Sequence, residues 1–214
     1  MYKPSNLFLL HAFILIVLSL AQPAETVLAQ EGGAGDPGPQ IMTSGSTDEP
    51  VIILREWLGE LDTSDHLWME IYVDGRVVRH VPEYMKEAGT WIGQLSSDEF
   101  DRLTQSLAAT GILEMDTAAT ARNVQSGEPD LTYSSDPSLV EIEVRYVTNL
   151  ARSEAGSTSS TSKKLTWLGL RRDARKYPDN TAIQGLSSAY KQLSSVAQHA
   201  VKQGEIAHSK EGRQ

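Results

Sequence analysis

Alternation of apolar and polar residues predicts a series of β-strands, because successive side chains of a strand point to opposite faces of its sheet. Apolar residues take every second position of residues 67–73, and polar or aromatic residues take the positions between them. Asp74-Gly75 follows, and strand character resumes over residues 76–81, so this stretch predicts a tight hairpin. The remaining predicted strands cover residues 51–57, 90–95, 140–146 and 163–169.

Apolar residues at helical spacing predict two helices. The first begins at Ser97, whose hydroxyl is expected to cap the helix, and it ends at Gly111 as a left-handed stop. The second covers residues 181–202, with Asp179 or Asn180 as its cap. Its apolar stripe runs through Ile183, Leu186, Tyr190, Leu193, Ala197 and Ala200.

The order of these elements predicts an α+β fold. Strands come in hairpin groups instead of alternating singly with helices, which favours an antiparallel sheet. We therefore expect an antiparallel sheet of about five to six strands with two helices packed on one face. Residues 116–138 and 149–162 are polar and contain the turn-forming residues Gly, Ser or Pro, so they predict two long loops. The basic cluster of residues 171–176 is predicted to be a solvated face or the approach to a helix.

The N-terminal segment has the three zones of a secretory signal peptide, which we predict for residues 1–29. Lys3 supplies a positive charge, residues 7–20 are almost wholly apolar, and Ala29 is a small residue before a cut at Gln30. An uncleaved anchor is the alternative, and the membrane would then be contacted only through this segment. Both outcomes place the remainder of the chain outside the cytoplasm.

The rest of the chain divides by composition. Residues 30–50 are rich in Gly, Pro and Ser and lack hydrophobic periodicity, so they predict a disordered linker. One α+β domain is expected over residues 51–203, a common size for a single hydrophobic core. Residues 204–214 are mostly polar and predict a flexible tail.

Composition also narrows the compartment and the partners. The chain has no cysteine, which removes disulfides, thiol catalysis and cysteine-type zinc sites, and its formal net charge is −9. An acidic domain repels phosphate backbones, so nucleic acid is not an expected partner. An exported domain without disulfides or an N-glycosylation sequon fits the periplasm or the extracellular space of a bacterium.

No motif along the chain predicts catalysis, a cofactor or a metal site. Ser64-Asp65-His66 contains the residue types of a hydrolase triad, but adjacent residues cannot converge with the imidazole between the other two groups. These three residues are expected to form a polar turn. The spacing of His66, His80 and His199 is not that of a zinc site.

Five side chains form a candidate binding surface. They are Trp68, Tyr72, Glu70, Glu141 and Glu143. The first three lie opposite the apolar row of their strand, and the last two share the polar face of another strand. Paired carboxylates can hydrolyse glycosides when the pKa of one of them is raised. Their alternation with Val and Ile instead indicates the solvent face of a sheet.

Three fold motifs follow one another within residues 51–115. They are the Asp74-Gly75-Arg76 hairpin, the helix start Gln94-Leu95-Ser96-Ser97-Asp98-Glu99-Phe100 and the stop Gly111-Ile112-Leu113. With these motifs the chain resembles the emfourin-type small bacterial exported domains, and the match continues more loosely through residues 139–148 and the last helix. That family includes a proteinaceous inhibitor of thermolysin-like metalloproteases, so the resemblance implies a protease-directed binding role. It assigns no inhibitory residue, because the shared motifs are those of the fold.

The functional expectation is an exported, non-enzymatic binding module, with protease inhibition as the role that the resemblance implies. Its partner is expected to be an extracellular or periplasmic protein such as a protease. Long loops on a compact scaffold are places where binding often occurs. Two alternatives are a hydrolase of unfamiliar type that uses Glu70, Glu141 or Glu143, and a structural protein of the cell envelope.

Overall fold

An antiparallel β-sheet forms the centre of the structure, a computed structural model that describes residues 39–59, 65–125, 138–147, 160–203 and 205–206. The strands are β1 (Gln40–Ile41), β2 (Ile52–Trp57), β3 (Leu67–Ile71), β4 (Arg76–Val81), β5 (Gly89–Gln94), β6 (Leu139–Val147), β7 (Ser160–Leu168) and β8 (Glu205–Ile206). The helices are α1 (Ser97–Ala108), α2 (Thr117–Gln125), α3 (Leu170–Lys176) and α4 (Thr181–Gln203). The six longer strands lie in the order β7-β6-β2-β3-β4-β5, with β1 beside β6 and β8 beside β5.

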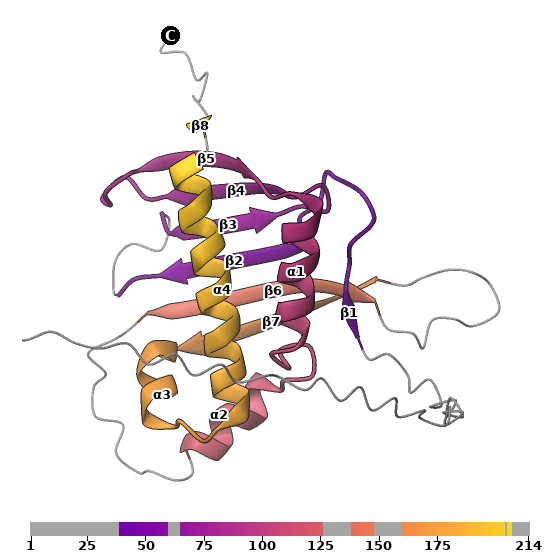
Figure 1. Ribbon diagram of the computed structural model, residues 1–214. Coiled ribbons are helices and arrows are strands. Elements are labelled where there is room, and N and C mark those ends of the chain that lie inside the picture. Colours follow the sequence, from indigo (N-terminus) through magenta and orange to yellow (C-terminus); the bar gives the residue numbers. More distant parts are fainter. Residues whose placement is uncertain (1–38, 60–64, 126–137, 148–159, 204, 207–214) are drawn as a thin grey trace, which may run out of the picture. The chain divides into compact units, whose positions relative to one another are not determined.

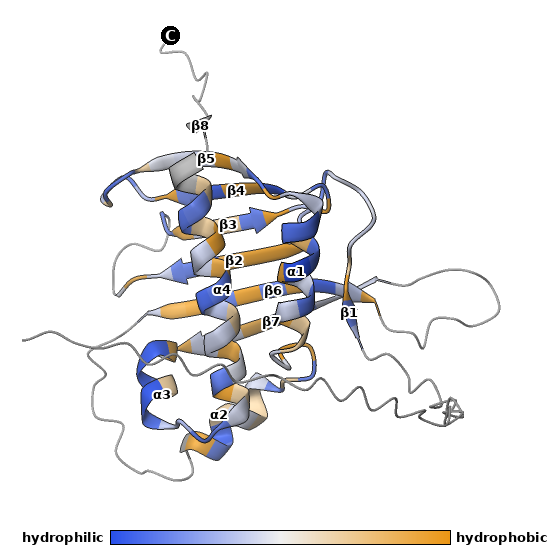
Figure 2. Cartoon of the chain, viewed as in Figure 1, coloured by the Kyte–Doolittle hydropathy of each residue, from blue (hydrophilic) through white to orange (hydrophobic). Residues whose placement is uncertain are grey.

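Helices α1 and α4 lie across one face of this sheet (Figure 1). We call this the inner face. Apolar side chains of the strands meet the apolar stripe of α4 there, and the apolar stretches of β2 and β6 run behind the helix (Figure 2). Core side chains with no exposed surface include Ile52, Ile71, Leu107, Ile142, Ile183 and Leu193. The predicted α+β fold, an antiparallel sheet with helices on one face, is therefore confirmed.

The Asp74-Gly75 hairpin between β3 and β4 forms as predicted. Gly75 has a φ of +82°, in the left-handed region that favours glycine. Its carbonyl also accepts a hydrogen bond of 2.9 Å from the backbone N–H of Leu95, at the end of β5. A Cβ atom at position 75 would overlap the Leu95 carbonyl oxygen, so both the turn and the close approach require glycine.

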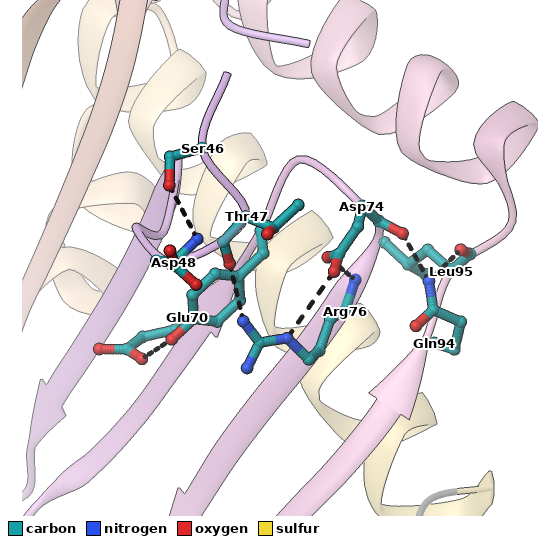
Figure 3. A network of polar contacts seen from close by, with 9 residues as sticks. Ser46, Thr47, Asp48, Glu70, Asp74, Arg76, Gln94 and Leu95 are labelled. Atoms are coloured by element: carbon teal, nitrogen blue, oxygen red, sulfur yellow. Dashed lines mark hydrogen bonds and ion pairs between the residues drawn. The ribbon is translucent and has the colours of Figure 1, made fainter. Parts of the chain in front are cut away.

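A polar network surrounds this hairpin (Figure 3). The guanidinium of Arg76 donates to the backbone carbonyl of Thr47 at 2.9 Å and lies 3.9 Å from the Asp74 carboxylate. The side-chain amide of Gln94 donates to the backbone carbonyls of Asp74 at 2.6 Å and Leu95 at 3.1 Å. These bonds connect the segment before β2 to the hairpin and to β5.

Side-chain caps determine where both long helices begin. The first helix is capped by Ser96 and not by Ser97: the Ser96 hydroxyl accepts from the N–H of Glu99, whose carboxylate accepts from the N–H of Ser96 at 2.9 Å. This reciprocal capping box needs a Glu three residues after the cap. Glu99 stands at that distance from Ser96, so Ser96 is the cap. Asn180 caps α4, since its Oδ1 accepts from the N–H of Ile183 at 3.1 Å.

Two helices occupy stretches that were not predicted as helical. Helix α2 lies inside the expected loop 116–138, where Asp116 caps it by accepting from the N–H of Ala119 at 2.9 Å. Helix α3 contains the basic cluster 171–176 and follows Gly169 directly after β7. Both helices are short and only partly apolar, so their residues show no clear helical period. Helices of this length are stabilised mainly by tertiary packing and only weakly by the helix propensity of their residues.

The folded part of the chain extends beyond the expected limits of residues 51–203. Part of the expected linker 30–50 is ordered, because β1 pairs with β6 and Ile41 is only 5% exposed. Part of the expected tail pairs with β5 as β8. The predicted signal peptide 1–29, with residues 30–38, lies outside the described residues, as do residues 126–137 and 148–159 of the two expected loops. None of the described helices is long and apolar enough to cross a membrane.

Gly185 provides a test of how closely α1 and α4 approach. Alanine in a helix is ordinarily about 1 kcal/mol more favourable than glycine. A Cβ atom at position 185 would overlap the backbone carbonyl oxygen of Thr110, just after α1. We expect Gly185→Ala to lower the free energy of unfolding by about 2–3 kcal/mol because of this overlap.

The measurement is urea unfolding followed by circular dichroism. Ser188→Ala, at an exposed position of the same helix, is the control and is expected to change stability by less than about 0.5 kcal/mol. A Gly185→Ala variant as stable as the original chain would contradict the close approach.

Candidate functional site

The face of the sheet opposite α1 and α4, which we call the outer face, carries two cross-strand rows of side chains. The strand register places the first row as Thr166, Glu141, Arg55, Trp68, His80 and Thr90. The second row is Lys164, Glu143, Ile53, Glu70, Val78 and Ile92. Four of the five residues predicted as a binding surface therefore share one face: Trp68, Glu70, Glu141 and Glu143.

Basic side chains hold the two glutamates of β6. Arg55 Nη1 lies 2.7 Å from a carboxylate oxygen of Glu141 and 3.8 Å from one of Glu143. Lys164 Nζ lies 2.8 Å from the other oxygen of Glu141, whose side chain is only 9% exposed. Both oxygens of the Glu141 carboxylate are thus occupied by cationic side chains. The arrangement is a surface of ion-paired charges.

Tyr72, the fifth predicted residue, follows β3 and is largely buried. Its hydroxyl donates to the Glu70 carboxylate at 2.8 Å, and the guanidinium of Arg76 lies 3.7 Å from the centre of its ring. Burial raises the pKa of the Tyr72 phenol, and the adjacent Glu70 raises it further. Tyr72 therefore stays protonated at neutral pH and can donate this hydrogen bond to Glu70.

His80 is fixed at the other end of the first row. Its Nε2 lies 2.7 Å from Asp65 Oδ1, and its Nδ1 lies 3.4 Å from the hydroxyl of Thr90. The hydrogen bond with His80, together with a second from the backbone N–H of Glu83, lowers the pKa of Asp65. The ring of Trp68 stacks on His80 with centroids 5.5 Å apart.

The structure also resolves part of the expected polar turn at Ser64-Asp65-His66. The Asp65 carboxylate forms a hydrogen bond with the ring of His80 on β4. His66 stacks on Trp57, with ring centroids 4.6 Å apart. Ser64 lies outside the described residues. Asp65 and His66 thus contact different partners, His80 and Trp57.

A cavity of about 290 Å³ lies on the inner face, beside the C-terminal half of α4. We call it the α4 pocket. Its apolar wall comprises Leu54, Leu58, Leu67, Met69, Met85 and Ala197. Its polar side chains are those of Glu56, Arg79, Arg171, Tyr190, Ser194 and Gln198. Of the five residues predicted as a binding surface, only Trp68 borders this pocket.

Glu56 is the buried carboxylate of the α4 pocket, with 8% of its surface exposed. The hydroxyl of Tyr190 lies 2.9 Å from each of its carboxylate oxygens, and Arg171 Nη2 lies 3.0 Å from one of them. Arg171 also contacts the Tyr190 hydroxyl. Burial raises the pKa of the Tyr190 phenol, so this hydroxyl stays protonated and acts as the hydrogen-bond donor to Glu56.

Arg79 enters the pocket from the inward row of β4. Its Nη1 donates to the backbone carbonyl of Ala197 at 2.9 Å, and its Nε is buried without a hydrogen-bond partner. Within the described ranges it forms no ion pair with a carboxylate. Burial lowers the pKa of its guanidinium.

Glu56 and Arg79 were not predicted as site residues, although the chain carries a signal for both. Each takes an inward position of its strand, Glu56 after Ile52 and Leu54, and Arg79 between Val77 and Val81. A charged residue within an apolar row marks a buried charge that needs a partner. The partners themselves lie on α4 and α3, far along the chain.

Comparison with known proteins adds no assignment, because neither a protein-family model nor a curated protein matches the sequence. No group of three or more His, Cys, Asp or Glu side chains could hold a metal ion in the part of the chain that the structure describes. The two candidate sites are thus defined by their own geometry: the ion-paired outer face and the α4 pocket.

Tyr190→Phe tests the network around Glu56. Removal of the hydroxyl leaves a buried carboxylate without one of its donors, and we expect the free energy of unfolding to fall by about 1–3 kcal/mol. Urea unfolding at neutral pH measures the change. Tyr84→Phe is the matched control, because Tyr84 is exposed and its hydroxyl makes only a 3.4 Å contact. Equal stabilities of the two variants would contradict the network.

Proposed function

We propose that this chain is an exported, non-enzymatic binding module whose outer face binds a protein partner. The observation that carries the proposal is the first row of that face, where Trp68 lies between Arg55 and His80. Trp and Arg are the residue types that contribute most to binding in protein interfaces. Both neighbours of Trp68 are held in place by carboxylates, Glu141 on one side and Asp65 on the other.

Fixed side chains favour binding because less conformational entropy is lost when a partner docks. The second row adds apolar surface next to the charges: Ile53 and Val78 are half-buried, and Ile92 is 43% exposed. An apolar and aromatic centre among charged groups is the usual composition of a protein-binding surface. The expected partner is therefore a protein with a complementary apolar patch and charges of both signs.

Export rests on the sequence, through the apolar stretch of residues 7–20 and the small residue Ala29 before the expected cut. The absence of cysteine agrees with a domain whose stability depends on its own core. The resemblance to emfourin-type domains supports an extracellular or periplasmic metalloprotease as the partner. Binding of a protease requires no catalytic group in the module itself.

The hydrolase alternative has less support. It needs one carboxylate in a desolvated pocket with a second within reach. Neither Glu70, Glu141 nor Glu143 lines the α4 pocket, and Glu141 has two cationic partners. A structural role in the cell envelope has no specific observation in its favour.

The test is a binding and inhibition assay with the chain from Gln30 onward. Thermolysin-like metalloproteases secreted by the host are titrated with it, and peptide hydrolysis and complex formation are measured. We expect a stoichiometric complex and slowed hydrolysis. Trp68→Ala is expected to weaken the complex at least about tenfold, because the central aromatic anchor is removed.

Trp91→Ala is the matched control. Trp91 on β5 pairs with Arg79 on β4, so its side chain belongs to the inner face. Its complex should retain the original affinity, and circular dichroism checks that both variants fold. Equal affinities for the Trp68→Ala variant and the original chain would refute the outer face as the binding surface. If no metalloprotease of the host forms a complex, the protease version of the proposal fails.

A further inference from the structure

We propose that the α4 pocket binds a small amphipathic monocarboxylate, with its carboxylate on Arg79 and its apolar chain against the Leu and Met wall. This site lies on the inner face, shares only Trp68 with the outer-face row, and does not depend on the function proposed for the outer face. Four features of the pocket support the inference: its size and lining, its charge balance, the donor of Arg79 that lacks a hydrogen-bond partner, and its access to solvent.

The size and lining of the pocket suit an aliphatic chain. Its volume of about 290 Å³ is near the lower limit of ligand pockets in proteins, which hold a small molecule of mainly apolar surface. Leu54, Leu58, Leu67, Met69 and Met85 supply the wall. Methionine side chains are unbranched and polarizable, so they adapt to flexible apolar ligands.

The charge balance of the pocket leaves one positive charge. Glu56 is already satisfied, since it accepts from Tyr190 and forms an ion pair with Arg171. Arg79 is the second cation that lines the pocket, and it makes no ion pair among the described residues. Glu87 and Glu56 act on Arg79 only at longer range, so a guanidinium without a contacting carboxylate in a partly buried site is complementary to one carboxylate, whereas a dianion would bring a further charge into the pocket without a partner.

Arg79 also has donors in the arrangement that a carboxylate requires. A carboxylate binds a guanidinium with two parallel N–H···O bonds, and one such pair of donors is Nε with a terminal nitrogen. Nη1 of Arg79 is used by the carbonyl of Ala197 at 2.9 Å, while Nε is buried without a partner. A buried donor without a partner costs free energy, which a bound carboxylate would recover.

A ligand can reach the pocket without unfolding of the chain. Arg171 lines it with a side chain that is 53% exposed, and Gln198 lines it from an exposed position of α4. Leu54 and Met69 close the opposite side as part of the buried core. The net charge of −9 disfavours general adsorption of anions, so saturable binding of a carboxylate would report this site.

The test is isothermal titration calorimetry of the full chain with hexanoate, octanoate and decanoate, at a salt concentration held constant. Octanol and octylamine are the neutral and cationic controls. We expect one site per chain, with affinity rising about fourfold for each added methylene until the pocket is filled. Octanoate should bind at least about tenfold more tightly than octanol, because only octanoate forms charge-assisted bonds with Arg79.

Arg79→Met keeps the length of the side chain and removes its charge and donors, and we expect it to weaken octanoate binding at least about tenfold. Arg175→Met is the matched control, because Arg175 is exposed on α3 and does not line the pocket. In nitrogen-15 NMR spectra of the original chain, the Nε–H resonance of Arg79 should shift on addition of octanoate.

Absence of octanoate binding to the original chain overturns the proposal, as does octanol binding as tightly as octanoate. Equal octanoate affinity in the Arg79→Met variant and the original chain also overturns it. Should Arg79→Met fail to fold, the comparison of octanoate with octanol and the NMR shift on the original chain still decide the question.

Discussion

The packing of α4 on the inner face of the sheet is the contact on which the rest of the structure depends. The helix presents a continuous apolar stripe, and side chains such as Ile183 and Leu193 have no exposed surface. Helix α1 approaches the same helix at Gly185, and α3 packs beside it. Burial of apolar area is the main favourable term in folding, so the position of α4 determines where the remaining helices can lie.

Two charged side chains from the sheet interrupt this apolar contact beside α4. They are those of Glu56 on β2 and Arg79 on β4. Glu56 is compensated by Tyr190 and Arg171, whereas the Nε of Arg79 has no hydrogen-bond partner. A buried charge costs several kcal/mol unless it is paired. The core is therefore incomplete at the α4 pocket, and a pocket that combines apolar side chains with a few polar groups is typical of a ligand site.

The two faces of the sheet have different properties although they share the same strands. On the inner face, apolar burial provides stability, and the α4 pocket lies beside the helix. On the outer face, the cross-strand pairs Arg55–Glu141 and Trp68–His80 form a row of ordered polar and aromatic groups. The Arg55–Glu141 pair is partly buried, since the Glu141 side chain is only 9% exposed, and it fixes the position of Arg55 beside Trp68.

The sequence by itself determined the elements whose signals are local. Alternation placed the strands, Asp74-Gly75 placed the hairpin, and the stripe of α4 placed the last helix, because each depends on residues close in the chain. It also placed Trp68 and the glutamates of β6 on polar faces. Only the tertiary structure decided their neighbours: Arg55 meets Glu141 and Tyr190 meets Glu56 across 86 and 134 residues. Contacts over such separations depend on strand register and helix packing, which no local pattern encodes.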